Sequence, residues 1–387
     1  MARVGAGALA CLVLGLAGSH SFAATLEERV AALRGSLSKN SAGKIVDVNL
    51  EDSAATVEDV QLIAKEADLV RLRLWGADVK DDAIDLLVKL PKLADLSLIN
   101  SAVTDAGLAK LRQIKTLRQL NLQGSTELTN EGMATIAQLG ELTHLSLAYT
   151  KINDPGVAAL APLKKLKLLD VRGCLITDAG LAIVGELPAL VALKCRSSAI
   201  TDAGLVHLAG AKQLRGLHLE DAKLSDEGMA QLAGLTALDD LNLLRVPITD
   251  AGLAPLAGMT KMRQLGLRGT FVADDGLQHL AGMKELFKLD LSETEVAGPG
   301  LEHLAALPKL EWLNLWNTFV EDDSLEFIAR MSAMKDLVLD GTMITDAGLS
   351  KLSALSKLKT LSVTQTGVGA ESVAALEKAI PGVQVAH

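Results

Sequence analysis

The sequence is poor in aromatic residues, cysteine and proline, and it carries no excess of positive charge. Its 387 residues include three tryptophans, one tyrosine, five phenylalanines, three cysteines and nine prolines, and the formal net charge is −9. An acidic chain of this kind is a poor general binder of nucleic acid or anionic membranes. Beyond residue 23, no uncharged apolar stretch of about 18 or more residues is present, so we expect no membrane-spanning helix there. No linker or low-complexity tract sets off a second domain, so we expect no attached catalytic domain.

Residues 1–23 have the pattern of a secretory signal peptide. Arg3 precedes an apolar run over residues 4–17, and residues 21–23, Ser-Phe-Ala, match a small-x-small cleavage site. The alternative is an uncleaved anchor, but the apolar run is too short to span a bilayer comfortably. We therefore predict a periplasmic or secreted protein with no membrane insertion after signal cleavage.

Most of the chain repeats one pattern with a period of 24 residues, as in residues 200–223, ITDAGLVHLAGAKQLRGLHLEDAK. Every step is 24 residues except the one from Val103 to Leu128, which is 25 because one residue is inserted in a loop. The units begin at Val79, Val103, Leu128, Ile152, Ile176, Ile200, Leu224, Ile248, Val272, Val296, Val320, Ile344 and Val368. A fixed period of this length predicts a solenoid of stacked units.

Each unit combines a strand-like half with a helix-like half. The L-x-x-L-x-L half, which includes Leu217 and Leu219, ends in the alternation of a short strand with one buried side. The ITDAGLxxLA half, as in residues 248–257, spaces its apolar residues along one helical face, and Thr201 or Asp202 can cap such a helix. Stacked strands lie about 4.8 Å apart whereas helices need about 8–10 Å, so the solenoid must curve. The sequence therefore predicts an α/β fold with a curved parallel sheet on the concave face and helices on the convex face.

These units resemble the leucine-rich repeats of bacterial proteins with 24-residue ITDAGL-type units, over about residues 56–380. They are also similar to the cysteine-containing repeats of F-box substrate receptors, although no F-box is present. Where that class places cysteine or asparagine after the strand, this chain has mostly small hydroxyl side chains, which can bond the backbone of the tight turn. This hydroxyl column consists of Thr150, Cys174, Ser198, Thr270, Thr294, Thr318, Thr342 and Thr366. The resemblance implies a leucine-rich repeat solenoid, a fold used for recognition in many families.

The two ends of the repeat array are expected to carry caps, because a solenoid exposes apolar edges at its ends. The N-terminal cap should contain an amphipathic helix over residues 26–38 and a first strand over residues 45–50. The C-terminal cap should contain a helix over residues 371–379 and a short strand over residues 383–385. The predicted segments are a signal peptide (1–23), an N-terminal cap (24–55), leucine-rich repeats (56–369) and a C-terminal cap (370–387).

Two cysteines lie beyond residue 23, and their positions in the repeat disfavour a disulfide between them. Cys195 occupies the buried leucine position of its strand, whereas Cys174 occupies the hydroxyl column one repeat earlier. These positions differ by three residues, or about 10 Å along the strand, which is beyond the reach of a disulfide. We therefore expect two buried thiols.

The repeats contain no clear catalytic, metal or cofactor site. His207, His279 and His303 share one column of the outer helices, where a solvated helix face explains them better than a metal site. The recurring aspartates begin helices about 8–10 Å apart, so their side chains alone cannot share a calcium ion, and helix capping explains them better. The glycine that follows, such as Gly204, indicates close packing in the first helical turn. We predict a non-enzymatic protein without a metal or cofactor.

The variable strand residues point into the concave face, where an aromatic group is the first candidate for binding a partner. Trp312 and Trp316 flank Asn314 on one strand, an arrangement typical of interface hot spots. The alternative is that the indoles lie flat over neighbouring lysine side chains and stabilise one repeat. Phe271 and Phe319 occupy the same loop position two repeats apart, where they could extend an apolar rim or only cover the turn.

A basic group is the second candidate. Arg172, Lys194 and Arg196 place like charges on neighbouring strands, and Arg268 occupies the same concave column as the other two arginines. Such a group could dock an acidic partner. The alternative is a solvated mixed-charge face, in which Asp170, Glu220 and Asp221 supply the counter-charge.

We therefore predict an exported, non-catalytic, monomeric protein that binds a protein partner of unknown identity through its concave face and binds no nucleic acid. One alternative is a substrate-recognition receptor of the F-box-like ubiquitin-ligase type. That alternative needs an F-box segment, and residues 24–55 are too short for one and are already assigned to the cap. The other alternative is a structural envelope protein or a binder of glycans through the tryptophans.

Overall fold

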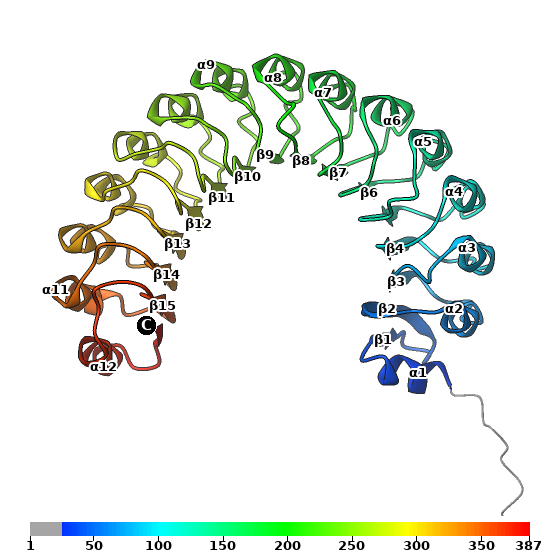
Figure 1. Ribbon diagram of the computed structural model, residues 1–387, viewed down its shortest axis with the longest axis horizontal. Helices are drawn as coiled ribbons and strands as arrows, with labels where there is room; N and C mark the ends of the chain where they lie inside the picture. Colours follow the sequence, from blue (N-terminus) through cyan, green and yellow to red (C-terminus); the bar gives the residue numbers. More distant parts are fainter. Residues whose placement is uncertain (1–24) are drawn as a thin grey trace, which may run out of the picture.

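The structure is a computed structural model that describes residues 25–387 and forms an open arc (Figure 1). Strands line the inside of the arc and helices line the outside, which confirms the predicted fold class. The strands follow one another in sequence order; β1 pairs antiparallel with β2, and all later neighbours are parallel. Each repeat therefore contributes one strand, one turn, one helical segment and a return loop.

The strands of residues 25–387 are β1 (Ser36–Lys39), β2 (Ile45–Ala54), β3 (Arg71–Trp75), β4 (Asp95–Ile99), β5 (Gln119–Asn121), β6 (His144–Ser146), β7 (Leu168–Arg172), β8 (Ala192–Arg196), β9 (Gly216–Glu220), β10 (Asp240–Asn242), β11 (Gln264–Gly266), β12 (Lys288–Asp290), β13 (Trp312–Asn314), β14 (Asp336–Val338), β15 (Thr360–Ser362) and β16 (Gln384–Ala386). The α-helices are α1 (Leu26–Ala32), α2 (Val57–Ile63), α3 (Asp81–Leu87), α4 (Asp105–Leu111), α5 (Asn130–Ile136), α6 (Asp154–Ala159), α7 (Asp178–Gly185), α8 (Asp202–Leu208), α9 (Asp226–Met229), α10 (Leu325–Ile328), α11 (Asp346–Leu349) and α12 (Ala370–Ala379). The 3₁₀ helices are η1 (Ala230–Leu232), η2 (Asp250–Leu256), η3 (Asp275–Leu280), η4 (Pro299–Leu304), η5 (Asp322–Ser324) and η6 (Ser350–Ala354).

A single apolar core runs the length of the arc between the sheet and the helices. In β10, Leu241 is buried, whereas its neighbours Asp240 and Asn242 are partly exposed on the concave side. The parallel register places leucine beside leucine from strand to strand, as in Leu241 and Leu265. The core therefore consists of ladders of like side chains, each contributed by the same position of successive repeats.

The turn after each strand is closed by the hydroxyl column. The Thr270 hydroxyl donates to the Leu267 carbonyl at 2.7 Å, and the preceding Gly269 has a φ of +67°. The same bond to the carbonyl three residues earlier is made by Thr150, Thr294, Thr318, Thr342 and Thr366. The predicted role of these hydroxyls is therefore confirmed at six positions.

Ser198 is the exception, and its assignment to the hydroxyl column was wrong. Its side chain is exposed, and Ser197 instead donates its hydroxyl to the Ile176 carbonyl at 2.6 Å. Residues 196–199 include no positive φ, so this turn lacks the left-handed residue that directs the column side chain inward.

The aspartates of the ITDAGL segment link neighbouring repeats. Thr201 caps its own helix, because its hydroxyl accepts from the Ala203 amide, whereas Asp178 of the preceding repeat accepts from both the amide (2.8 Å) and the hydroxyl (2.6 Å) of Thr201. The prediction of helix capping is thus right for the threonine and wrong for the aspartate, whose carboxylate bonds the following repeat. Equivalent links join Asp81 to Thr104, Asp105 to Thr129, Asp154 to Thr177, Asp202 to Ser225, Asp226 to Thr249 and Asp322 to Thr345.

The convex segments on either side of β12 depart from this arrangement. Ala273 and Ala297 replace the capping threonine, and Gly298 replaces the aspartate. Asp274 keeps the bond to the backbone amide at this position, that of Ala297 (3.1 Å), and its other oxygen accepts from the amides of Gly298 (2.9 Å) and Gly300 (2.8 Å). Both segments, η3 and η4, are 3₁₀ helices that begin without a hydroxyl cap.

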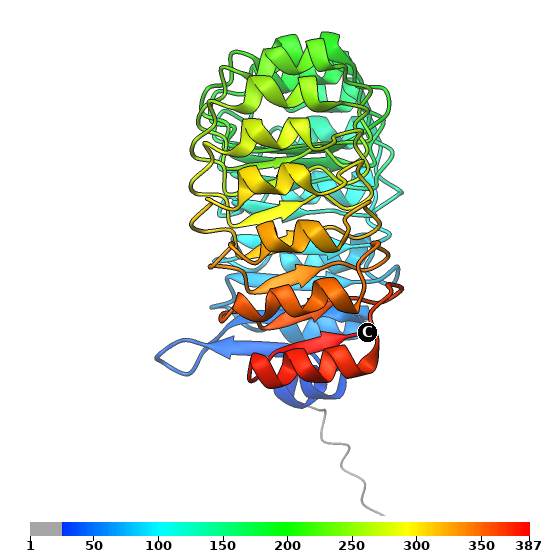
Figure 2. The same ribbon diagram turned by 90° about the vertical axis from the view of Figure 1, so that its left-hand side faces the viewer.

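The N-terminal end differs from the expected single helix over residues 26–38, which was wrong beyond Ala32. Arg34 takes a positive φ of 55°, and Gly35 packs so close to β2 that a Cβ there would lie 2.5 Å from Leu50. The chain therefore turns, and Ser36–Lys39 pairs antiparallel with β2 as β1. Figure 2 shows the turn of this blue hairpin projecting beyond the edge of the sheet.

The remaining end predictions have mixed outcomes. At the C-terminal end, α12 and β16 lie within one residue of the predicted helix and strand. The predicted signal peptide lies outside the described residues. Within residues 25–387, no helix is long and apolar enough to cross a bilayer.

Both cysteines of the repeats are buried as free thiols. Cys174 donates its thiol to the Leu147 carbonyl at 3.0 Å, and Cys195 faces the core. Burial raises the pKa of both thiols, that of Cys195 to about 12. Since the thiolate is the reactive form, both groups should be inert in the folded protein.

We predict that iodoacetamide at pH 8.5 alkylates neither Cys174 nor Cys195 in the native protein and modifies both in urea, as measured by mass spectrometry. Raising the pH to 9.5 should leave native Cys195 unmodified, because that pH is still well below its pKa of about 12. Rapid alkylation of Cys195 under native conditions would show that the middle of the core is open to solvent.

Candidate partner-binding surface

Trp312 and Trp316 project from the concave side of β13 and the residues that follow it. Leu313 and Leu315 alternate with them and are fully buried in the core. Both indoles are partly exposed, and the Asn314 side-chain oxygen accepts from the Trp316 amide at 3.0 Å. The alternation of the strand therefore places both tryptophans on the inner surface of the arc, with Asn314 fixing the turn between them.

Each indole contacts a cation from an earlier repeat, one repeat away for Trp312 and two repeats away for Trp316. The Lys288 ammonium lies 4.7 Å from the Trp312 ring centroid, and the Arg268 guanidinium lies 4.9 Å from that of Trp316. Arg268 also donates to Glu293 at 2.7 Å. Contacts of this kind contribute about 0.5–1 kcal/mol each at exposed sites and hold the rings in one orientation.

We call Arg268, Lys288, Trp312, Asn314 and Trp316 the aromatic patch. Its strands β11 to β13 are consecutive, so four of the residues chosen from the sequence lie together. The lysine contact that we considered as the alternative is present at Lys288. Lys335 pairs with Glu311 instead, at 2.8 Å.

The basic group on β7 and β8 is largely neutralised. Arg172 makes two bonds to the buried Asp170, at 2.7 and 3.0 Å, and this pairing raises the pKa of the guanidinium. Arg196 pairs with Asp221 at 2.5 Å, a carboxylate that it shares with Arg245. Within residues 25–387, Lys194 makes no ion pair. The counter-charges expected for the mixed-charge alternative are therefore present on both arginines.

The basic group and the aromatic patch are separate. The first lies on β7 and β8 and the second on β11 to β13, so β9 and β10 stand between them. Of the acidic residues considered as counter-charges, Glu220 serves another role, since its carboxylate accepts from the side-chain amide of Asn242 at 3.0 Å. The structure thus divides the seven candidate residues between two places on the concave face.

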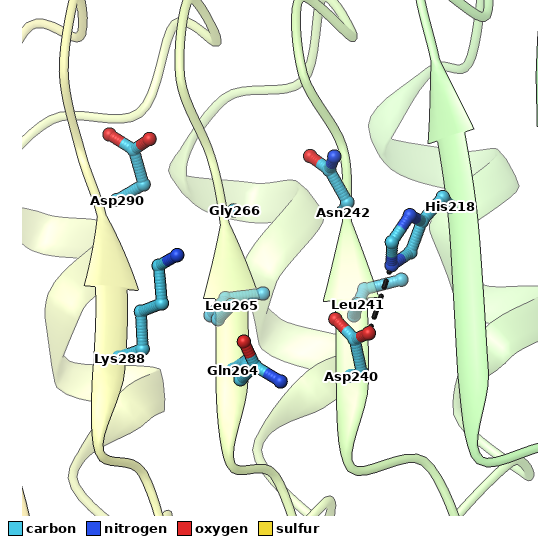
Figure 3. Close-up of a pocket in the computed structure, with 9 residues that line it drawn as sticks. All are labelled: His218, Asp240, Leu241, Asn242, Gln264, Leu265, Gly266, Lys288 and Asp290. Carbon is cyan, nitrogen blue, oxygen red and sulfur yellow. Dashed lines mark hydrogen bonds and ion pairs between the residues drawn. The ribbon is translucent and has the colours of Figure 1, made fainter. Parts of the chain in front are cut away.

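A polar pocket of about 200 Å³ lies between the basic group and the aromatic patch (Figure 3). Lys288 lines this pocket and is also part of the aromatic patch. We call it the Gly266 pocket, because the missing side chain of Gly266 opens the space between Asn242 and Asp290. A Cβ at Gly266 would lie 2.7 Å from the Asn242 oxygen. The pocket is lined by His218, Asp240, Leu241, Asn242, Gln264, Leu265, Gly266, Lys288 and Asp290.

Some of the polar groups of the Gly266 pocket are already engaged, and others are free to contact a ligand. His218 and Asp240 form a 3.0 Å pair (Figure 3), and Asp290 accepts from the backbone amide and the hydroxyl of Ser292, both through the same oxygen. Gln264 has no side-chain hydrogen bond within residues 25–387. The pocket therefore offers both donors and acceptors to a polar group about the size of one side chain.

Comparison with known proteins identifies the family. The family described as a leucine-rich repeat region matches residues 97–384. The chain belongs to the leucine-rich repeat family. A search of curated protein sequences finds no match.

Three solved structures of bacterial proteins are similar to this chain, and the first of them shares its fold. An internalin (inlF) from Listeria monocytogenes is 22% identical, with a TM-score of 0.64 and 93% of each chain covered. A leucine-rich repeat protein from Leptospira interrogans is 16% identical, with a TM-score of 0.46 and coverage of 87% of this chain and 95% of that one. Internalin C2 from L. monocytogenes is 21% identical, with a TM-score of 0.43 and coverage of 56% and 91%. At these identities the likeness concerns the fold of this leucine-rich repeat protein alone.

The histidines of the outer helices lie on the convex side of this leucine-rich repeat protein. His279 and His303 lie on η3 and η4, on the convex side. Among residues 25–387, no three His, Cys, Asp or Glu side chains are placed to hold one metal ion.

Sequence reasoning missed the Gly266 pocket, although two signals pointed to this part of the chain. Gly266 is the one glycine in the middle concave column of the repeats that runs from Arg73 to Ser362. Six of the nine aromatic residues of the leucine-rich repeat protein fall between residues 271 and 327. Such a concentration in an aromatic-poor chain marks these repeats as unusual.

Proposed function

We propose that this leucine-rich repeat protein is an exported, non-catalytic binding protein that holds a protein partner on its concave face. The observation that carries the proposal is the aromatic patch: two partly exposed indoles on one strand, each held by a cation. Rigid, amphipathic aromatic side chains supply most of the binding energy in typical interfaces. The Gly266 pocket beside the patch adds hydrogen-bonding groups that can select the partner.

Export and the monomeric state are parts of the proposal that rest on different observations. The pattern of residues 1–23 supports export. Strand β1 and helix α12 cover the two ends of the arc. Because the apolar core is covered at both ends, a second copy of the chain is not needed to shield it, which supports a monomer.

Lys194, whose ammonium makes no ion pair within residues 25–387, is the member of the basic group best placed to contact an acidic part of the partner.

The test is affinity capture from the native envelope and culture medium with three immobilised proteins, wild type, Trp312→Ala/Trp316→Ala and Trp75→Ala, and with a blank support. Trp75 is the matched control, because it is also an exposed concave tryptophan but lies on β3. We expect a protein that is retained by the wild type and Trp75→Ala and lost with the double variant, since removing two hot-spot residues costs about 100-fold or more in affinity.

Circular dichroism establishes first that the variants are folded. Treatment of the captured fraction with glycosidases separates protein from glycan recognition, and retention after treatment is the expected result. Identical capture by the double variant and the wild type would contradict the proposal and assign the tryptophans a structural role.

A further inference from the structure

The loops that follow the strands carry a row of exposed apolar side chains at one position of the repeat. Leu175 is 65% exposed, Phe271 54%, Phe319 52% and Met343 54%. Each of them follows a member of the hydroxyl column, so they differ in sequence by multiples of 24. Single exposed apolar residues are ordinary on a protein surface, but two half-exposed phenylalanines beside a concave aromatic patch are not.

Backbone hydrogen bonds fix Phe271 and Phe319 outside the core. The Phe271 amide donates to the Ile248 carbonyl and the Phe319 amide to the Val296 carbonyl, both at 2.9 Å. Thr270 on one side of Phe271 is buried, as is the valine on the other side. Because the side chains of an extended segment alternate, the ring cannot turn inward without displacing one of these neighbours.

A hollow of about 510 Å³ lies between the two phenylalanines, and we call it the rim pocket. Its lining consists of Gly269, Thr270, Phe271, Glu293, Thr294, Glu295, Asn317 and Phe319. Its size is within the range of typical binding cavities, about 300–1,000 Å³. The pocket thus combines two apolar walls with an acidic centre.

The two acidic residues of the rim pocket differ in their partners. Glu293 is held by Arg268, the residue whose guanidinium also lies over Trp316, so one arginine joins the rim pocket to the aromatic patch. Glu295 is exposed and makes no ion pair within residues 25–387. Glu321, two residues after Phe319, is likewise exposed and without an ion pair in that range. The net charge of −9 adds a long-range attraction for cations.

We propose that the rim pocket is a second contact site for the protein partner and takes a bulky apolar side chain flanked by lysine or arginine. The apolar side chain fills the space between Phe271 and Phe319, and the flanking cation pairs with Glu295. This inference deepens the proposed function, because it assigns a chemistry to the partner segment that crosses the rim next to the aromatic patch.

The experiment uses a defined probe and needs no natural partner. A pentapeptide with 4-fluorophenylalanine at its centre and two lysines on each side is titrated with the protein, and binding is measured from ¹⁹F line broadening. A second peptide carries glutamates in place of the lysines. We expect the wild type to broaden the lysine peptide and to affect the glutamate peptide at least about tenfold less.

The variants locate the site. Phe271→Ser/Phe319→Ser should reduce broadening of the lysine peptide about tenfold, and Glu295→Gln about two- to fivefold. Leu175→Ser is the matched control, because it removes an exposed apolar side chain at the same loop position four repeats away, and it should leave the broadening unchanged. All four side chains are exposed, so the variants should retain the native circular dichroism spectrum.

Equal broadening by the double variant, equal broadening of both peptides, or no broadening by the wild type would overturn the inference. The outcome is independent of the capture experiment, which removes Trp312 and Trp316 and leaves the rim pocket intact. A partner lost with the tryptophan variant but retained by Phe271→Ser/Phe319→Ser would contradict the rim pocket while supporting the proposed function.

Discussion

Leu243→Ala should lower the free energy of unfolding by about 2–5 kcal/mol, whereas Leu244→Ala should lower it by less than about 1 kcal/mol. The two leucines are consecutive, but Leu243 is completely buried and Leu244 lies partly exposed on the concave side. Truncating Leu243 leaves a cavity in the leucine ladder, and the stacked repeats on both sides limit how far the core can collapse into it. Urea unfolding followed by circular dichroism measures both effects.

The Leu244→Ala variant is the control, because both substitutions remove the same atoms and differ only in the burial of the leucine. Equal losses for the two variants would mean that the strand does not alternate between core and concave face. That result would also undermine the placement of Trp312 and Trp316.

Gly204→Val should cost about 3 kcal/mol, and Gly210→Val should cost little. A Cβ at Gly204 would lie 2.4 Å from the Asp178 carboxylate oxygen and 3.0 Å from Leu181, whereas one at Gly210 would meet nothing within 4 Å. The valine therefore displaces the carboxylate that bonds Thr201 and uncouples two neighbouring repeats. The unfolding midpoint in urea reports the loss.

A double-mutant cycle isolates the mechanism. Asp178→Ala removes the group with which the new side chain collides, so Gly204→Val should cost less in that background than in the wild type. Strict additivity of the two costs would contradict the proposed collision. So would a Gly210→Val variant that is as destabilised as Gly204→Val.

The architecture could be predicted because the repeat imposes the same local pattern many times. The spacing of Leu217 and Leu219 specifies a strand with one buried side, and the mismatch between strand and helix spacing requires an arc. The role of the aspartates was only partly predicted. Local capping rules assign Asp178 to its own helix, whereas its partner is Thr201, 23 residues away in the next repeat. Only the packed structure shows that the glycine of the motif makes room for this carboxylate.

The candidate surface was less accessible to sequence reasoning than the fold. Alternation was enough to place Trp312 and Trp316 on the concave side, but not to show that Arg268 bonds Glu293 while lying over Trp316. The Gly266 pocket arises from a missing side chain and from the register of four strands, so no sequence motif predicts it. The turn at Ser198 departs from its repeat through backbone conformation, which the residue types did not reveal.

Hydroxyl-radical footprinting of the complex with the captured partner tests whether the partner binds on the concave face. We expect binding to reduce oxidation of Trp312 and Trp316 several-fold and to leave Trp75 on β3 and His303 on the convex side unchanged. Protection confined to His303 and the convex helices, or a bound partner that leaves both tryptophans as reactive as in the free protein, would contradict binding on the concave face.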